Sequence, residues 1–379
     1  MQNQSPGGGG EPDRDGDQLP ADGRLLALAW KTDARYDRCA CHAARISSVS
    51  MNKSAQEQVP DGLGLADEGL VRWVSEVRRS SGPSCREAGA QRLRAASQAR
   101  SASRPRGPEL PLVQNLRIDR GLAVRLYRPT LDLRPIVLYL HGGGFVVGDL
   151  ESHDGACRRL ARIADVTVLA LDYRLAPEHP GPAAVDDVVG AFVWAREHLQ
   201  ELGGDPEAGV ALAGDSSGGA LAVLAAVRLH AGGIDPSALL LAYPNADMTL
   251  RGDSVTQEGH GWGLEADDLR WFVEQWLPAP DWCDDPQVSP AHADLTGLPP
   301  TLLATAQHDP LRDEGNALAQ PLRDVGARCS THRTAGWSTA SSGSVMSLRR
   351  QPRPAAFSLT VLATSFATAQ QCRPTERPL

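Results

Sequence analysis

The sequence lacks several features that mark membrane, secreted and nucleic-acid-binding proteins. No apolar run has the length of a transmembrane helix, and the nearest to one is Phe357–Ala369. Residues 1–23 contain no apolar core behind a basic start, so they do not resemble a secretory signal. The net charge of −8 offers no basic excess of the kind that binds nucleic acid. We therefore expect a cytoplasmic, globular protein with no nucleic-acid partner and no membrane span.

Cysteine is also sparse. The seven cysteines are odd in number and scattered, which argues against a disulfide framework. Cys39 and Cys41 stand beside His42, but no second pair of ligands follows at zinc-finger spacing. We expect free thiols, no metal and no organic cofactor.

The C-terminal part lacks acidic residues and hydrophobic periodicity. After Asp324 the one acidic residue is Glu376, against seven arginines. Residues 1–50 have little periodicity either, which is typical of disorder, and Met51 is a candidate for the true start. The chain is thus predicted to comprise a disordered extension (1–50), a helical cap or lid segment (51–105), an α/β domain (106–328, with a lid insertion at 255–280) and an aberrant, disordered tail (329–379).

Strand-like and helix-like segments alternate within the α/β domain. Residues 113–118 and 122–129 alternate apolar and polar side chains, as antiparallel strands do. Continuous apolar runs, typical of strands covered on both faces, follow at 134–143, 166–173, 209–217, 238–244 and 300–309. Helical segments are predicted between them at 151–164, 185–199 and 218–233. This order predicts a doubly wound, mostly parallel α/β sheet.

Gly214–Gly218 has the pattern G-x-S-x-G between a predicted strand and a predicted helix. In α/β-hydrolases this pattern forms the nucleophile elbow, a tight turn that exposes a serine hydroxyl above the sheet. The five residues alone could be an ordinary glycine-rich turn. The strand before them and the helix after them favour Ser216 as a nucleophile.

A glycine-rich loop, Leu140–Asp149, follows the first central strand. Successive glycines allow backbone N–H groups to point into a cavity, where they can stabilise the oxyanion formed by attack on a carbonyl. Gly143 and Gly144 are the predicted donors, together with the N–H of Ser217. A phosphate-binding loop would need the sequence G-K-[ST], which is absent here.

Together these motifs resemble the hormone-sensitive lipase family of α/β-hydrolase fold carboxylesterases. The matching segments, spread between Leu110 and Arg328, are HGGGF, DYRLAPEHP (Asp172–Pro180), GDSSGG (Gly214–Gly219), VSP (Val288–Pro290) and HDPLRDEG (His308–Gly315). The resemblance implies a serine carboxylesterase or lipase-like hydrolase of short- to medium-chain esters, acting through an acyl-enzyme on Ser216. It also implies a small-molecule ester substrate, and it allows a homodimer.

The resemblance makes Asp309 the acid of a catalytic triad, where it would orient an imidazolium. Asp313 and Glu314 fall where a helix is predicted to begin, so we expect both to cap its N-terminus. Arg174 and Glu178 belong to a family segment that braces the active-site loop, and structural roles are expected for them.

A lid that shapes the acyl pocket is a further feature of the family. Its candidates here are residues 51–105 and 256–277. The aromatic side chains of the second segment could offer apolar surface to an acyl chain, or could simply pack its helix against the domain: Trp262, Trp271, Phe272 and Trp276.

The triad histidine is not present at its family position. The family places it in an H-G-F segment after the last strand, but the one histidine after Asp309 is His332, which belongs to the strand itself. A serine at its ordinary pKa needs a neighbouring general base. The literal chain is therefore expected to be impaired, and the alternative is a non-catalytic small-molecule receptor resembling gibberellin receptors. Amide hydrolysis on the same site is also left open.

The segment Gly336–Ser342 offers an explanation. Its residues can be encoded as GGC-TGG-TCC-ACG-GCT-TCC-TCC. Read two nucleotides further on, the same letters give CTG-GTC-CAC-GGC-TTC-CTC, or Leu-Val-His-Gly-Phe-Leu, which is the family's histidine segment. With the loss of acidic residues, this predicts a reading-frame change close to Arg328, in the gene or in its sequencing. The last strand and helix are accordingly predicted to be missing or non-native.

Overall fold

The described part of the chain contains one eight-stranded sheet. The computed structural model describes residues 74–75, 78–79, 82–104, 106–325, 327 and 329–338. The strand order is β1-β2-β4-β3-β5-β6-β7-β8, and only the β1–β2 and β2–β4 pairs are antiparallel. The strands are β1 Leu112–Arg117, β2 Ala123–Arg128, β3 Ile136–Leu140, β4 Thr167–Asp172, β5 Val210–Asp215, β6 Leu239–Ala242, β7 Thr301–His308 and β8 Cys329–Ser338. The predicted mostly parallel α/β fold is confirmed.

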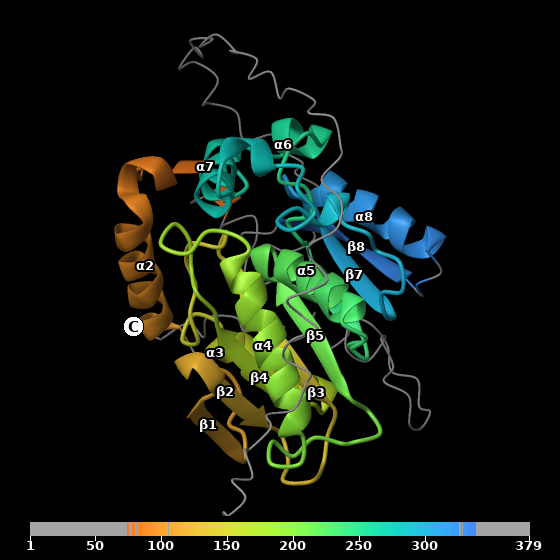
Figure 1. Cartoon of the computed structure of the whole chain (residues 1–379). Helices are drawn as coiled ribbons and strands as arrows, with labels where there is room; N and C mark the ends of the chain where they lie inside the picture. Colours follow the sequence, from red (N-terminus) through yellow and green to blue (C-terminus); the bar gives the residue numbers. More distant parts are fainter. Residues whose placement is uncertain are drawn as a thin grey trace, which may run out of the picture. The chain divides into compact units, whose positions relative to one another are not determined.

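Helices cover both faces of this sheet (Figure 1). Leu138 of β3 packs in one apolar cluster with residues of α4, α5 and α8, whereas Val137 and Tyr139 pack with α3. Neighbouring residues of a strand point to opposite faces, so α3 lies on the face opposite the other three helices. The helices are α2 Cys85–Ser103, α3 Asp154–Ala164, α4 Ala183–Glu197, α5 Ser217–Ala231, α6 Asp253–Gln257, α7 Ala266–Trp276 and α8 Arg312–Asp324.

A last strand is present, so of the two predicted alternatives, a missing or a non-native strand, the structure excludes a missing one. β8 lies parallel to β7, with Cys329 opposite Thr301 and Ser338 opposite His308. The prediction relied on side-chain composition, whereas pairing with the edge of a sheet requires backbone N–H and C=O groups that every residue except proline has. The predicted final helix, the extension 1–50 and most of 51–81 lie outside the described residues.

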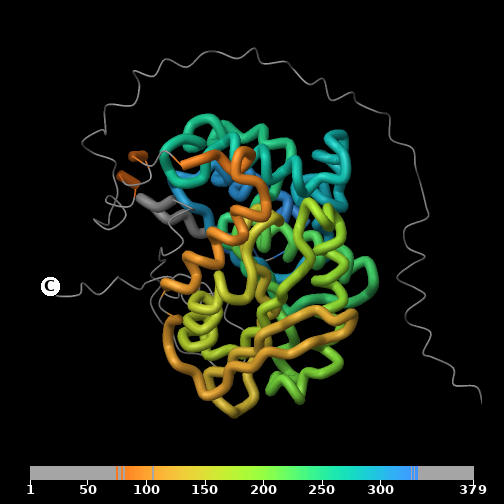
Figure 2. The backbone as a smooth tube through the Cα atoms, turned by 90° about the vertical axis from the view of Figure 1, so that its left-hand side faces the viewer, coloured from red at the N-terminus to blue at the C-terminus, as the bar shows by residue number. Residues whose placement is uncertain are grey.

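The two segments predicted to form a lid are distant in the sequence and lie side by side. Ser84 caps α2 through a reciprocal capping box with Glu87. The backbone N–H of Cys85 donates to the Asp268 carboxylate of α7 over 2.7 Å. Figure 2 shows the orange α2 segment running beside the turquoise α7 segment. The insertion after β6 is thus joined to the N-terminal helix.

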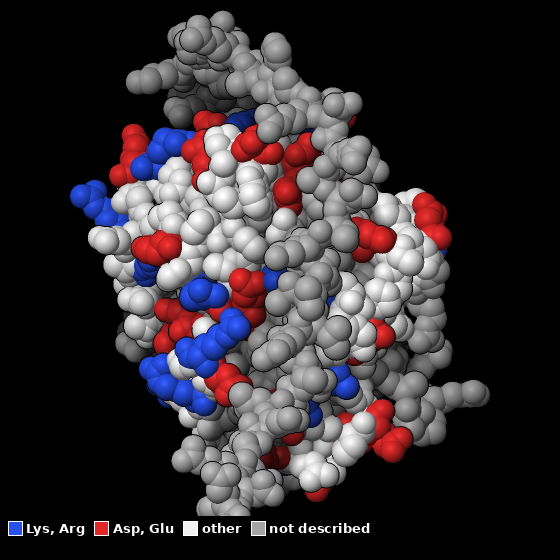
Figure 3. Space-filling model, in the orientation of Figure 1, with Lys and Arg blue, Asp and Glu red and all other residues white. Residues whose placement is uncertain are grey.

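Charged side chains of both signs are interspersed over the described part of the face in Figure 3. Arg174 pairs with the buried Asp187 over 2.7 Å, and Arg94 pairs with Glu178 over 2.6 Å. Arg174 and Glu178 therefore make the structural contacts expected of them. Among the described helices, none combines the length and apolar character needed to span a bilayer.

The predicted capping roles of Asp313 and Glu314 are wrong. The N-cap residue of α8, Leu311, makes no side-chain cap, and the first-turn N–H of Asp313 donates instead to the Ser254 hydroxyl over 3.1 Å. Asp313 accepts from the N–H of Ser254 over 2.8 Å, and Glu314 accepts from Asn245 Nδ2 and the N–H of Ala246 over 2.8 and 2.7 Å. Both carboxylates are used to hold segments that follow β6. Burial raises the pKa of Glu314 to about 8.

The start of α5 packs directly on the end of β3. A Cβ atom on Gly218 would collide with the carbonyl oxygen of Leu140, a backbone atom that cannot move aside. We expect Gly218→Ala to lower the free energy of unfolding by about 1–3 kcal/mol, measured by denaturant titration. Gly190→Ala is the matched control, because Gly190 is an exposed α4 residue with open space at its Cβ position. The control should gain up to about 1 kcal/mol; equal effects of the two variants would contradict this packing.

The pKa of Glu314 also predicts a pH dependence of stability. Its pKa is about 8 in the folded state against 4.5 ordinarily, so its protonated form stabilises the fold fully below pH 4.5. That contribution decreases as the pH rises to about 8. Glu314→Gln should reduce the loss of unfolding free energy between pH 5 and 8, measured by denaturant titration at each pH.

Glu178→Gln serves as the control for this experiment. The pKa of Glu178 is lowered to about 2, chiefly by its hydrogen bond to Arg94, so it titrates outside the tested range. This variant should shift stability by the same amount at every pH. A pH slope in Glu314→Gln identical to that of the parent chain would refute the assignment.

Candidate active site

Ser216 stands in a strained turn between β5 and α5. Its φ of 50° and ψ of −121° are unfavourable for a residue with a side chain. Its N–H donates to Ala242 over 2.9 Å, and its carbonyl oxygen accepts from the N–H groups of Gly219 and Asn245 over 3.0 and 3.1 Å. Three backbone hydrogen bonds therefore fix the turn, and Ser216 itself is half-buried.

Asp215 ties this turn to the glycine loop. Its Oδ1 atom accepts from the N–H of Gly142 over 3.0 Å and from the hydroxyl of Tyr139 over 2.7 Å. His153 Nε2 lies 3.6 Å from the other carboxylate oxygen. Burial alone would raise the pKa of Asp215, but His153 and Tyr139 lower the pKa below its ordinary value. A charged carboxylate therefore links the two predicted site segments.

The loop itself presents free backbone donors. Gly143 and Gly144 have φ values of 131° and 59°, and the carbonyl oxygen of Gly143 accepts from the N–H groups of Val146 and Val147. Within the described residues, the N–H groups of Gly143 and Gly144 have no hydrogen-bond acceptor. Ser217 opens α5, and the first N–H groups of a helix lack partners inside it. These three donors are available to an incoming oxyanion.

Asp309 follows β7 and is fully buried. Its Oδ1 atom accepts from the N–H of Leu311 over 2.8 Å, and its carbonyl oxygen accepts from the N–H of Arg312 over 3.0 Å. Strands β5 and β7 are parallel, with β6 between them. Ser216 and Asp309 follow these two strands directly, so both lie at the carboxyl-terminal end of the sheet. The described contacts do not join the two side chains directly.

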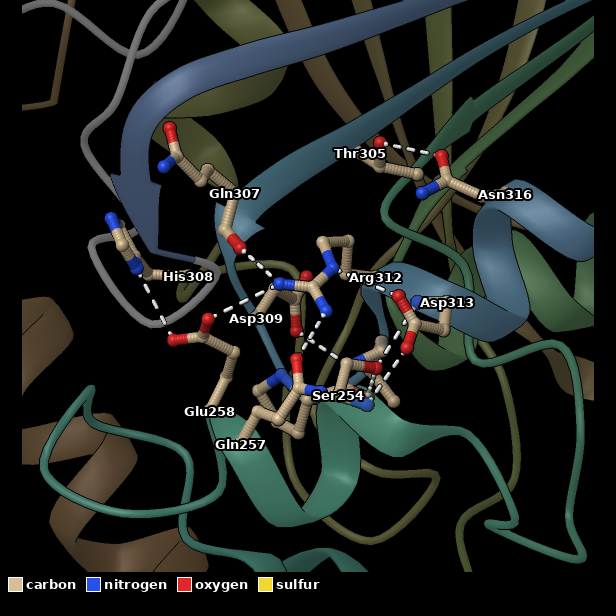
Figure 4. A network of polar contacts seen from close by, with 12 residues as sticks. Ser254, Gln257, Glu258, Thr305, Gln307, His308, Asp309, Arg312, Asp313 and Asn316 are labelled. Atoms are coloured by element: carbon tan, nitrogen blue, oxygen red, sulfur yellow. Dashed lines mark hydrogen bonds and ion pairs between the residues drawn. The ribbon is translucent and has the colours of Figure 1, made fainter.

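Sequence reasoning missed a polar cluster beside Asp309 (Figure 4). Glu258 follows α6 and bridges His308 Nδ1 over 3.2 Å and Arg312 Nη1 over 3.1 Å. The ring of His308 also stacks on Trp262 at a centroid distance of 4.0 Å. The lid insertion is therefore fastened to the turn that carries the predicted acid. The sequence offered no signal for this, because Glu258 and Arg312 are 54 positions apart.

No histidine among the described side chains forms a hydrogen bond with Ser216. His332 lies opposite Ala304 inside β8, six residues before the strand ends at Ser338. Its backbone therefore lies within the strand, as predicted. The segment from Thr339 onward is outside the described residues.

Three of the four lid aromatics are packing residues. Trp276 is fully buried, stacks on Phe145 and donates from Nε1 to the carbonyl oxygen of Val288 over 3.0 Å. Trp271 and Trp262 are also buried. Phe272 is different, because its half-buried ring lies against Gly144. Of the two roles left open by the sequence, packing therefore describes the three tryptophans, and the acyl-binding role stays a prediction for Phe272.

Comparison with curated proteins finds esterases. The chain is 43% identical over 213 residues to the carboxylic ester hydrolase LipN of Mycobacterium tuberculosis, covering 54% of this chain and 57% of that protein. It is 42% identical over 212 residues to an ethyl acetate hydrolase of Pseudomonas putida, covering 54% and 66%. The chain thus spans less than two thirds of the length of these relatives.

Solved structures and family comparison agree with this result. The esterase of Pyrobaculum calidifontis superimposes with a TM-score of 0.62 at 37% identity, covering 66% of this chain and 84% of that one. Residues 137–338 match the family described as alpha/beta hydrolase fold. This match takes in β3 to β8, the strained serine turn and the glycine loop. Since it covers more than half of the 379 residues, the chain belongs to the alpha/beta hydrolase fold family.

Proposed function

We propose that this protein is a serine carboxylesterase for short- to medium-chain esters, with Ser216 as nucleophile. The observation that carries the proposal is the strained Ser216 turn, which Asp215 joins to the glycine loop through the N–H of Gly142. In the described structure the next two N–H groups of that loop, those of Gly143 and Gly144, lack acceptors. The named activities of the relatives, carboxylic ester hydrolase and ethyl acetate hydrolase, support the same chemistry.

The proposed reaction follows from this arrangement. The Ser216 hydroxyl attacks the ester carbonyl, and the carbonyl oxygen becomes an oxyanion held by the N–H groups of Gly143, Gly144 and Ser217. A histidine takes the serine proton and returns it to the leaving alcohol, while Asp309 stabilises the imidazolium. Water then cleaves the acyl-enzyme through the same histidine.

The triad histidine is proposed to be encoded out of frame. The frame change is proposed to lie further along the chain than the amino-acid composition suggested. Residues 329–338 form β8, and the family match also extends to residue 338. We therefore place the frame change after the Gly336 codon instead of near Arg328. One added C after GGC would restore CTG-GTC-CAC-GGC-TTC. The histidine would then be encoded three codons after Gly336, just beyond the point where Ser338 pairs with His308.

A non-catalytic binding protein is the second candidate. It is favoured by the lack of a histidine bonded to Ser216 in the described part of the chain. Such a protein would be stabilised by small ligands without turnover, and a restored frame would not make it hydrolytic. A homodimer and a cytoplasmic location remain predictions from the sequence.

Restoring the frame tests the proposal. The chain with one added nucleotide after the Gly336 codon should hydrolyse p-nitrophenyl acetate and butyrate, measured by p-nitrophenolate release. The chain as written should be slower by about 10⁴-fold or more, because one member of a triad is absent. Ser216→Ala in the restored chain should lower its hydrolysis rate to that of the chain as written.

Ser237→Ala is the matched control for the serine substitution. The Ser237 hydroxyl is buried without a partner in the described structure and precedes β6, at the opposite edge of the sheet from Ser216. This variant should keep the restored activity. Hydrolysis that survives Ser216→Ala would exclude the proposed nucleophile, and a restored chain that binds esters without turnover would favour the second candidate.

A further inference from the structure

The ring of Phe272 borders the proposed oxyanion donors. A Cβ atom on Gly144 would collide with Cγ, Cδ1 and Cδ2 of this ring. The ring therefore lies within van der Waals reach of Gly144, roughly 4 Å from its backbone. Gly144 has a φ of 59°, which glycine adopts readily, and it carries no side chain that would collide with the ring.

The ring is held in place by both lid segments. Phe272 packs against the cluster of Val146, Ala176 and Trp271, and the centroids of the Trp271 and Phe272 rings are 5.2 Å apart. Leu93 of α2 packs against the same cluster. Packing against these neighbours restricts the motion of the Phe272 ring beside the glycine loop.

Polar contacts fasten the cluster to the loop. Arg94 of α2 donates to the carbonyl oxygens of Val146 and Ala176, each over 2.8 Å. Arg86 pairs with Glu274, two residues after Phe272, over 2.7 Å. The first contacts are partly buried, so they restrict α2 more than the exposed Arg86 pair does. Arg94 thus ties α2 to the glycine loop, and the Arg86–Glu274 pair joins α2 to the helix that carries Phe272.

The position of the ring restricts the substrate. An oxyanion bound to the N–H of Gly144 lies about 2.7–3.1 Å from that nitrogen. The acyl chain and the alkoxy group, which are both attached to the carbonyl carbon, then begin within a few ångströms of the Phe272 ring. Resting on the proposed function, we infer that Phe272 determines ester size, and that the favoured substrates carry short, unbranched, uncharged acyl groups.

Selectivity among esters tests this inference. In the frame-restored chain, Phe272→Ala should raise kcat/KM for p-nitrophenyl octanoate and pivalate relative to acetate by about tenfold or more, the scale on which apolar pockets discriminate. Arg270→Ala, an exposed change on the same helix, should leave these ratios unchanged. A uniform fall of kcat/KM for all three esters, or unchanged ratios, would overturn the inference.

A second measurement also uses the frame-restored chain. Ethyl p-nitrophenyl methylphosphonate and octylphosphonate label a serine when its oxygen bonds to phosphorus, p-nitrophenolate leaves and the hydroxyl proton passes to the restored histidine. Mass spectrometry should show that Phe272→Ala raises the octyl-to-methyl ratio of labelling rates at Ser216. If Ser216 is labelled but the ratio is unchanged, the proposed role of Phe272 is contradicted and the proposed nucleophile is not. Absence of label at Ser216 contradicts the proposed nucleophile, and the inference with it.

Discussion

The close approach of α5 to the end of β3 is the constraint on which the site depends. Gly218 lies beside the carbonyl oxygen of Leu140, and Gly214 lies beside the backbone of Gly218. No side chain fits at either position, so strand and helix come close enough to force Ser216 into a sharp turn. The strain at Ser216 is maintained by packing around it, since the residue alone would relax to another conformation.

Asp215 transmits this constraint to the glycine loop. One carboxylate oxygen binds both Tyr139 and the N–H of Gly142, so the loop and the serine turn share a buried anchor. A charged group is tolerated there because His153 and these two donors compensate for its burial. Among the described residues, the N–H groups of Gly143 and Gly144 can then stay without acceptors, a costly arrangement that is useful where negative charge develops.

The lid shows what sequence reasoning could not decide. Four aromatics of one segment offered equal apolar surface, yet Trp276 packs in the core and Phe272 lies on the glycine loop. Likewise, Asp313 and Glu314 occupy positions typical of helix capping, but they bind Ser254 and the chain after β6 instead. In each case several environments suit the residue type, and neighbours far along the chain select one.

The sequence by itself determined the strands, the helices between them and the serine and glycine motifs, because these depend on local periodicity and on residues without side-chain bulk. Asp309 was singled out by the resemblance to the hormone-sensitive lipase family, which places the triad acid after a buried strand. Only the tertiary structure decided that residues 329–338 complete the sheet, that Asp215 joins the two motifs and that Phe272 faces Gly144. These depend on backbone pairing and side-chain contacts between distant segments, which local patterns do not encode.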